Sequence, residues 1–502
     1  MDTLSTRSPL NPDRARQPRI AILGAGFSGM GMAIALKKRG LDNFTIYEKA
    51  DDVGGTWREN VYPGVACDVP SHLYSFSFEP NPDWSKRFSP GGEIWDYMKR
   101  VAKKYGLYEK TAFGKKVVRI RHDGRKWAVD FADGTKTEAD IVVSGLGGLH
   151  EPNIPRFEGR ETFRGPMFHT AQWRGDVDLK GKRVAIIGSA ASAVQVVPEI
   201  APQVAHLDIF QRTANWIMPR PSYQYPGWAK ALFRAIPQLA RLYRGFYFSM
   251  MEWRHGAFEG GDNYVKRFVA RTFDRHMREQ VKDPALRAKL TPTYPVGCKR
   301  ILISDRYLPA VQRDNVDIVT ASIDRIEEGG VRSKDGALHE ADVIILATGF
   351  KPFNLLDSID VVGPAGTTLA ETWRNGVAAH RTVAVPGFPN FFMLLGPNSG
   401  LGHNSVILMI EAQVNYVLKL IEAMRENGAA AIEPAQAAAA AYDKRLQQEL
   451  KDTVWAGGCQ SWYLDATGRN YTLYPHTVRR FIREMKAPDL AEYAFVNARA
   501  PA

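Results

Sequence analysis

The chain has 502 residues, 45% of them hydrophobic and 24% charged, which is the composition of a globular protein and enough length for two or three domains. Its formal net charge is +12, but Lys and Arg are scattered rather than gathered into blocks, which argues against a nucleic-acid-binding protein. No apolar run approaches the roughly 20 residues of a membrane span, which argues against an integral membrane segment.

The first recognisable unit begins near Arg19 with an apolar strand that runs into the segment 24–29, GAGFSG, and then into a helix. Glycines in this pattern permit a tight turn and let backbone amides approach a pyrophosphate at the helix N-terminus. A second strand ends at Glu48, which is placed to accept hydrogen bonds from a ribose diol. This combination predicts a dinucleotide site.

The loop recurs in modified form in the segment 188–193, GSAASA, again between an apolar strand and a helix. In both units a charged residue lies 24 positions after the first glycine, and here it is Arg212 instead of a glutamate. A carboxylate would repel a ribose 2′-phosphate, whereas a guanidinium binds one through two hydrogen bonds, so Arg212 favours NADPH over NADH. Ala190, in place of the second glycine, predicts a looser phosphate contact.

The duplication extends beyond the two loops. The segments 133–145 and 335–349 both read as a hairpin turn, Asp-Gly, followed by a fully apolar strand. We therefore predict an α/β fold with two Rossmann-like dinucleotide-binding domains.

Between 221 and 297 the pattern turns helical and rich in aromatic residues, which indicates an insertion in the second unit. Three interpretations stay open for it: a lid or wall beside the substrate, plain helical packing, or contact with a membrane surface. Later in the chain, Ala429 to Ala441 is expected to form a solvent-facing helix.

Cys67, Cys298 and Cys459 lie far apart in the sequence. Their spacing predicts no disulfide framework, no metal site and no CxxC-type redox pair. The polar first 19 residues lack the apolar stretch of a signal peptide. Both observations suit a reducing cytoplasm, so we expect a cytoplasmic protein.

These motifs are accompanied by three segments that resemble a known family. The segments 54–57, GGTW, and 62–68, YPGVACD, are similar to the flavin-contacting region of class B flavin monooxygenases. The segment 163–173, FRGPMFHTAQW, resembles the fingerprint F-x-G-x-x-x-H-x-x-x-W of the Baeyer–Villiger monooxygenases. Its fixed positions here are Phe163, Gly165, His169 and Trp173. Arg174 follows, where the fingerprint has Pro or Asp, a mild departure.

The resemblance covers the chain from Arg19 to about Phe481. It implies a monooxygenase that uses FAD, NADPH and O2 to convert a ketone into an ester or lactone through a C4a-peroxyflavin. The expected domains are 1–150 and 350–502 for FAD, 151–220 and 298–349 for NADPH, and 221–297 for the helical insertion. We expect a monomer or homodimer.

The segment 294–300, YPVGCKR, is similar to the family segment in which the arginine is catalytic and the preceding lysine helps to hold NADPH. This makes Arg300 the expected catalytic cation, oriented by Asp68. A peroxide that attacks a carbonyl carbon must stay anionic, and arginine suits this task because it keeps its proton at working pH. His169, in the connector between the units, is expected to couple domain movement rather than to take part in the chemistry.

The same resemblance assigns the cofactor contacts. Thr348 lies in an ATG segment that leads back to the FAD domain, and Asn398 precedes a helix whose N-terminus faces the flavin ring. Trp462, in a glycine-flanked loop, is expected to contact the nicotinamide cofactor, with a core tryptophan as the alternative. The expected cofactor-binding residues are Gly24, Gly26, Phe27, Ser28, Gly29, Glu48, Lys49, Gly55, Thr56, Trp57, Asp68, Tyr74, Gly188, Ser189, Ala190, Ser192, Gln195, Arg212, Thr213, Lys299, Thr348, Asn398 and Trp462.

Three alternative functions stay open. A class B flavin monooxygenase that oxidises sulfur or nitrogen shares the architecture but needs a carbonyl-activating cation less. A flavoprotein reductase that inserts no oxygen shares the two nucleotide sites but needs a pair of redox cysteines. A non-catalytic flavin-dependent sensor would not need Asp68 and Arg300.

Overall fold

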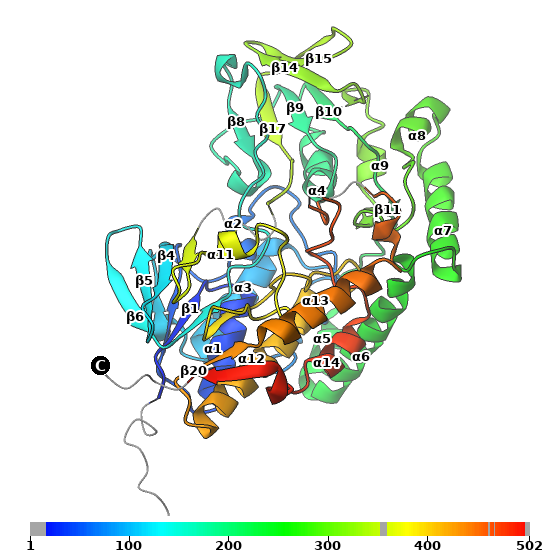
Figure 1. The fold of residues 1–502 in the computed structure, drawn as a ribbon. Coiled ribbons are helices and arrows are strands. Elements are labelled where there is room, and N and C mark those ends of the chain that lie inside the picture. Colours follow the sequence, from blue (N-terminus) through cyan, green and yellow to red (C-terminus); the bar gives the residue numbers. More distant parts are fainter. Residues whose placement is uncertain (1–16, 352–358, 460–461, 466, 497–502) are drawn as a thin grey trace, which may run out of the picture.

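The computed structural model describes residues 17–351, 359–459, 462–465 and 467–496, and Figure 1 shows them as two lobes. The lower lobe in that view is built on a five-stranded parallel sheet in the order β19-β7-β1-β2-β3. Its strands are β1 (Ile20–Leu23), β2 (Phe44–Tyr47), β3 (Thr111–Ala112), β7 (Ile141–Ser144) and β19 (Phe391–Met393).

The upper lobe contains a second five-stranded parallel sheet, in the order β13-β10-β9-β17-β8. Its strands are β8 (Met167–His169), β9 (Arg183–Ile187), β10 (His206–Phe210), β13 (Val316–Val319) and β17 (Val343–Leu346). The central strands β1 and β9 each precede a glycine loop. Read from β8, the second sheet has the order β8-β17-β9-β10-β13, which is equivalent to β19-β7-β1-β2-β3 in the first sheet. The predicted α/β fold with two Rossmann-like units is confirmed.

Each unit carries a smaller sheet as an extension, in keeping with the predicted repeat. In the first unit the extension is β18-β4-β5-β6, in which β4, β5 and β6 are antiparallel and β18 runs parallel to β4, and in the second it is the antiparallel sheet β14-β15-β16. The two Asp-Gly turns connect β5 to β6 and β15 to β16, as expected, and the strands that follow, β7 and β17, are buried at every position. The extension strands are β4 (Val117–His122), β5 (Trp127–Phe131), β6 (Lys136–Ala139), β14 (Ile323–Glu327), β15 (Gly330–Ser333), β16 (Leu338–Glu340) and β18 (Asp360–Val362).

Helices cover the two sheets. In the first unit α1 (Phe27–Lys38) packs against α12 (Val406–Glu426), a helix that is buried along most of its length and forms the centre of the largest hydrophobic core. In the second unit α4 (Ala191–Ile200) follows the modified glycine loop. Among the described helices, none is both long enough and apolar enough to cross a membrane. Other helices are α2 (Thr56–Glu59), α3 (Gly91–Lys104), α9 (Tyr307–Ala310), α11 (Leu369–Thr372), α13 (Gln436–Leu450) and α14 (Val478–Glu484).

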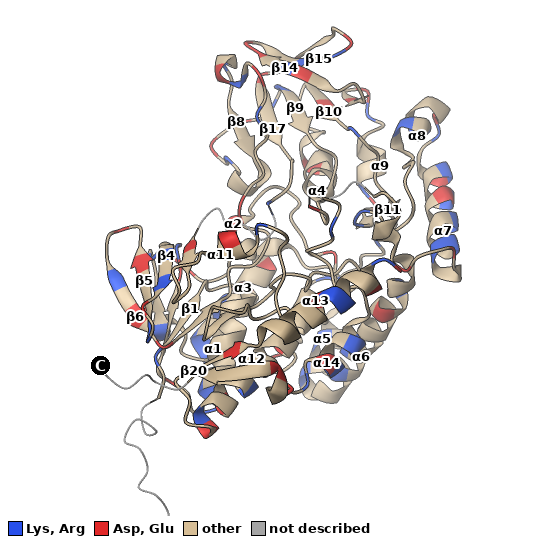
Figure 2. Ribbon diagram, in the orientation of Figure 1, with Lys and Arg blue, Asp and Glu red and all other residues tan. Residues whose placement is uncertain are grey.

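The segment 221–297 contains four helices, and in Figure 1 they lie along one side of the molecule, next to both lobes. They are α5 (Gly227–Ala235), α6 (Pro237–Trp253), α7 (Tyr264–Gln280) and α8 (Pro284–Leu290). Two short parallel strands, β11 (Ile217–Met218) and β12 (Leu302–Ile303), flank the segment and bring its two ends together. Figure 2 shows Lys and Arg spread over these helices and over the rest of the ribbon.

Two expectations are wrong. The segment expected as one helix over Ala429 to Ala441 begins instead with a strand, β20 (Ala431–Pro434), which pairs with β21 (Tyr493–Val496) before α13 starts. The alanines between 429 and 441 favour a helix locally. The first part of the segment nevertheless forms a strand, because it pairs with β21, some 60 residues away in the sequence.

The expectation of no disulfide is also wrong, because Cys298 and Cys459 are bonded across 161 positions, with their Cα atoms 5.6 Å apart. Sequence spacing carried no sign of this, since the two segments meet only in the folded chain, where the Trp455 indole also donates to the Gly297 carbonyl at 3.1 Å. Cys67 is a free, buried thiol.

Candidate active site

The first glycine loop has the backbone that a pyrophosphate site requires. Gly24 has φ of +93°, which favours glycine, and a Cβ on Gly29 would overlap the Gly24 carbonyl oxygen. Gly26 caps α1 without any side-chain hydrogen bond, so the first amides of the helix keep free donors. Glu48 is buried, and its carboxylate accepts from the amides of Ala25 at 2.7 Å and Ala50 at 2.9 Å, which ties the loop to the end of β2.

A cavity of about 890 Å³, within the size range of small-molecule sites, is lined by residues of the segments 49–61, 95–113, 150–152 and 171–172. Lys49 lines it and forms an ion pair with Glu59 at 2.9 Å. Trp95, Tyr108 and His150 contribute aromatic surface. Lys49, which lines the cavity, directly follows Glu48 in the sequence.

The segment that follows places aromatic residues along the same lobe. Gly55 caps α2 with φ of +50°, and Thr56 and Trp57 open the helix. The Trp57 indole donates to the Tyr74 hydroxyl at 3.1 Å, and the two rings pack edge to face. Tyr74 in turn packs against Phe27 in the first turn of α1.

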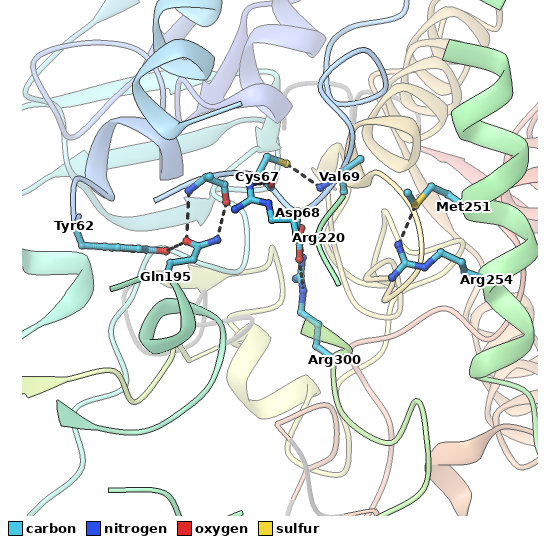
Figure 3. Close-up of polar contacts among 10 residues, drawn as sticks. Tyr62, Cys67, Asp68, Val69, Gln195, Arg220, Met251, Arg254 and Arg300 are labelled. Atoms are coloured by element: carbon cyan, nitrogen blue, oxygen red, sulfur yellow. Dashed lines mark hydrogen bonds and ion pairs between the residues drawn. The ribbon is translucent and has the colours of Figure 1, made fainter. Parts of the chain in front are cut away.

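Asp68 and Arg300 meet at the junction of the two lobes, although 232 positions separate them in the sequence (Figure 3). Arg300 donates from Nε to Oδ2 at 3.0 Å and from Nη2 to Oδ1 at 2.7 Å, which is a two-point ion pair. This geometry fixes the guanidinium plane as well as its position.

The two charges reinforce each other. Burial alone would raise the pKa of Asp68, but the charge and hydrogen bonds of Arg300 outweigh it and hold that pKa below its ordinary value. The negative charge of Asp68 raises the pKa of Arg300 against the effect of burial. The pair is therefore fully ionised at neutral pH.

A second contact joins the lobes beside this pair (Figure 3). Gln195, on α4, donates to the Ala66 carbonyl at 2.9 Å and accepts from the Tyr62 hydroxyl at 3.0 Å. Gly64 lies against the same helix, where a Cβ would overlap the Gln195 carbonyl oxygen. Gln195 thus anchors the segment that carries Asp68 to the second unit.

The second glycine loop presents a cluster of cations. Gly188 has φ of +108°, and Ala190 caps α4 without a side-chain hydrogen bond. Lys299 donates to the Thr213 hydroxyl at 2.8 Å, and burial together with the nearby charge of Arg212 lowers the pKa of Lys299. Within the described residues, Arg212 makes no ion pair. Arg212, Thr213 and Lys299 therefore form a positive, partly exposed site at the end of β10.

The connector between the lobes contains the four fingerprint positions. His169 ends β8, where it pairs with Leu346 of β17, and burial lowers the pKa of its imidazole. The His169 Nδ1 accepts from the Ala171 amide at 3.0 Å. Gly165 is required because a Cβ would overlap the Asp342 carbonyl oxygen, Phe163 packs beneath the second sheet, and Trp173 packs edge to face against Phe168.

Comparison with known proteins agrees with this geometry. A family model described as flavin-binding monooxygenase-like matches residues 17–362. A Baeyer–Villiger monooxygenase of Streptomyces coelicolor is 46% identical over 96% of this chain and 93% of its own length. The chain belongs to the flavin-binding monooxygenase-like family, with the Baeyer–Villiger monooxygenases. The family resemblance predicted from the fingerprint is confirmed.

Solved structures related to this family have the same architecture. The crystal structure of OTEMO in complex with FAD and NADP superimposes with a TM-score of 0.85 at 25% identity, covering 98% of this chain and 100% of that one. The closed crystal structure of cyclohexanone monooxygenase gives a TM-score of 0.85 at 27% identity, over 96% and 99% of the two chains.

Several positions taken from the family motifs have contacts that hold the protein itself together. Asn398 has φ of +56°, and its buried amide donates to the carbonyls of Asn470 and Leu473, both at 3.0 Å. The Thr348 hydroxyl donates to the Asn153 carbonyl at 2.6 Å in the connector. The Asn215 amide donates to the Ser189 carbonyl at 2.8 Å and to the Ser189 hydroxyl at 3.3 Å.

Trp462 is 48% exposed and packs on Tyr463, so it is not a core tryptophan. The open alternative for this residue is thereby removed. An exposed indole on a glycine-flanked loop is available to a ligand.

Two arginines near the Asp68–Arg300 pair match no motif in the sequence. Arg220 donates to the Cys67 carbonyl at 3.0 Å and lies over the Phe88 ring. Arg254 follows α6 and lines a small cavity together with Asp68 and Arg300. The helical pattern of the insertion gave no signal that the end of α6 reaches this site.

Proposed function

We propose that this protein is an FAD-containing, NADPH-dependent Baeyer–Villiger monooxygenase that converts ketones into esters or lactones. The observation that carries the proposal is the two-point Asp68–Arg300 ion pair at the junction of two dinucleotide-binding units. A guanidinium that cannot lose its proton, held in a fixed orientation, is the group needed where negative charge develops on oxygen.

The first unit fits FAD. The amides at the start of α1 suit a pyrophosphate, the buried Glu48 carboxylate lies at the end of β2 where a ribose is expected, and the cavity lined by Lys49 has room for adenosine. The proposed FAD contacts continue through Lys49, Gly55 and the Trp57–Tyr74 pair.

Bound FAD, once reduced, supplies the activation of O2. The residues of this chain then determine the outcome. The Arg300 guanidinium would stabilise the negative charge on the oxygen that attacks the ketone. After the attack it would stabilise the negative charge on the former carbonyl oxygen. Asp68 holds that guanidinium in place and keeps it protonated.

The second unit fits NADPH through Arg212, Thr213 and Lys299. Replacing Arg212 by alanine is expected to raise the Michaelis constant for NADPH roughly 10- to 100-fold, because one charge-assisted contact to the 2′-phosphate is lost. The constant for NADH, which lacks this phosphate, should change little. Steady-state NADPH and NADH oxidation measures both, and an unchanged preference would contradict the assignment.

The pH dependence of product formation provides a second test of Arg300. Because the pKa of Asp68 is lowered and that of Arg300 is raised, neither group of the wild-type pair titrates between about pH 5 and pH 10. The fraction of NADPH oxidation coupled to product should therefore show no step from this pair. In Arg300→Lys the ammonium can lose its proton, so coupling should fall at alkaline pH. The same alkaline fall in both proteins would assign it to another group.

The reaction class is tested by offering a cyclic ketone and a thioether separately and detecting addition of one oxygen atom by mass spectrometry. Oxidation of the ketone, with NADPH and O2 consumed in equal amounts, supports the proposal. Oxidation of the thioether alone would favour the sulfur- and nitrogen-oxidising alternative.

The disulfide bears on the reductase alternative, because a flavoprotein reductase needs a pair of redox cysteines and the sequence spacing predicted none. Cys298 and Cys459 provide such a pair, but both are buried, with 1% and 6% of their surface exposed. The similarity along nearly the whole chain to Baeyer–Villiger monooxygenases favours oxygen insertion. NADPH oxidation that needs a disulfide substrate and consumes no O2 would reverse this choice.

A further inference from the structure

Three side chains of the kinds that ligate metals lie together on one face of the second sheet. His206 and Asp208 belong to β10 and, because they are two positions apart, they lie on the same face. Asp317 lies on the neighbouring strand β13, where it is the register partner of Asp208. The ligand atoms of these three residues lie within 4.8 Å of one another. The pairing of β10 with β13 therefore brings one imidazole and two carboxylates together.

The distances within this group fit a shared cation better than direct hydrogen bonds. His206 Nε2 lies 3.5 Å from Asp208 Oδ1 and 3.5 Å from Asp317 Oδ2. A hydrogen bond from an N–H group to a carboxylate oxygen is about 2.7–3.2 Å long. Two tetrahedral ligands that each lie about 2.1 Å from a Zn²⁺ ion are about 3.4 Å from one another. A metal ion between the three groups would therefore require little movement of their side chains.

Asp208 is the most deeply buried member of the group, with only 5% of its surface exposed. The same face of the sheet carries Phe210 on β10 and Val319 on β13, which belong to a hydrophobic cluster that includes residues of the extension β14-β15-β16. A carboxylate in such surroundings is costly unless a cation or hydrogen bonds compensate its charge. A metal ion bound next to His206 would supply this compensation.

A second histidine faces Asp208 from the extension. His339, on β16, places its Nδ1 3.6 Å from the same Asp208 oxygen, and its Nε2 lies within hydrogen-bonding distance of the Ser333 hydroxyl, at 3.1 Å. The carboxylate ligands of metal sites commonly have polar neighbours that fix their orientation. We assign this positioning role to His339, because it lies outside the group of three mutually close ligands.

The group lies away from the proposed cofactor sites. In parallel sheets of this kind, nucleotides bind at the carboxyl ends of the strands, and Arg212 follows that end of β10. His206 is the first residue of β10, and Asp317 is the second residue of β13, so both lie near the amino ends of their strands. A metal ion at this position would connect the two strands and stabilise the second unit without contacting the reacting oxygen.

We propose that His206, Asp208 and Asp317 bind a divalent transition metal ion, for which Zn²⁺ is the best match. An imidazole nitrogen combined with carboxylate oxygens suits Zn²⁺, whereas Ca²⁺ and Mg²⁺ prefer oxygen ligands alone. Three protein ligands leave one tetrahedral position to water. This inference does not depend on the proposed function, because it concerns the opposite end of the strands.

The first test is calorimetric titration of the chelator-treated holoenzyme with Zn²⁺. The wild type should bind one equivalent with a dissociation constant below millimolar. Asp317→Asn should weaken that binding by about 10-fold or more, since loss of even an outer partner of a metal site commonly costs this much. The Asp317 side chain is 72% exposed, so this variant should fold normally. Asp314→Asn, which removes an exposed carboxylate just before β13, is the matched control and should bind Zn²⁺ as wild type does.

The second test measures stability. Zn²⁺ should raise the Tm of the wild-type holoenzyme and of Asp314→Asn, because a ligand that binds only the folded chain stabilises it. It should not raise the Tm of His206→Gln, which lacks the imidazole at the centre of the group. Ca²⁺ at the same concentration should leave the Tm of the wild type unchanged.

Zn²⁺ binding that is absent from the wild type, or equally strong in wild type and Asp317→Asn, would overturn the inference. Tighter binding of Ca²⁺ than of Zn²⁺ would also overturn it, because the site would then not select a transition metal. None of these measurements requires oxidation of a ketone, so failure of the proposed function would be seen separately.

Discussion

Arg300→Ala is expected to lose oxygenated product by about 10² to 10³-fold, while FAD stays bound and NADPH oxidation remains measurable. The variant removes the cation beside Asp68 but leaves the glycine loops and the cation cluster around Arg212 unchanged. Electrons should therefore still reach O2, and the oxygen should be released as hydrogen peroxide instead of being inserted. Parallel measurement of NADPH, hydrogen peroxide and ester gives the partition directly.

Arg306→Ala is a suitable control for this experiment. Arg306 is exposed, lies six positions further along the chain and pairs with Glu199 on α4. Its loss should leave the yield of ester per NADPH unchanged. Normal ester formation by Arg300→Ala would remove Arg300 from the proposed mechanism.

Gly29→Ala is expected to destabilise the protein by about 3 kcal/mol or more and to prevent FAD binding, because the new methyl group would overlap the Gly24 carbonyl oxygen. The backbone of the loop must move to accept it, and the loop joins β1 to α1 at the centre of the first unit. Denaturant unfolding of the FAD-free protein, with FAD titration of any folded fraction, measures both effects.

Gly26→Ala separates the two contributions. A Cβ at Gly26 would meet only the Gly55 Cα, at 3.8 Å, so the FAD-free protein should lose little stability. The methyl group would nevertheless lie where the pyrophosphate approaches the start of α1, so FAD affinity should fall. Equal destabilisation of both FAD-free variants would contradict the prediction that only the methyl group at position 29 overlaps the backbone.

The parts of the fold that were predictable are those encoded locally. The buried strands β1, β7, β9 and β17 are apolar at nearly every position. Each glycine loop also indicates where the following helix, α1 or α4, begins. The repeat then fixed the pairing of these elements, because the same order of strands occurs twice. Asp68 and Arg300 were predicted from the family motifs. No local sequence pattern indicates that these two residues, 232 positions apart, form an ion pair.

The parts that were missed depend on contacts between distant segments. β20 exists because β21 pairs with it, and the bond between Cys298 and Cys459 exists because two loops meet in space. Arg254 lies at the end of an amphipathic helix, where a charged residue normally faces solvent. Only the position of α6 against the two lobes brings it to the cavity.

The bond between Cys298 and Cys459 has a practical consequence for anyone who purifies this enzyme. It joins the segment that leads to Arg300 to the segment around Trp455, which the indole of Trp455 also links through its hydrogen bond to the Gly297 carbonyl. A thiol reductant strong enough to open this buried bond would remove one of the two links between these segments. Rates from two preparations are comparable only when free sulfhydryls have been counted in both.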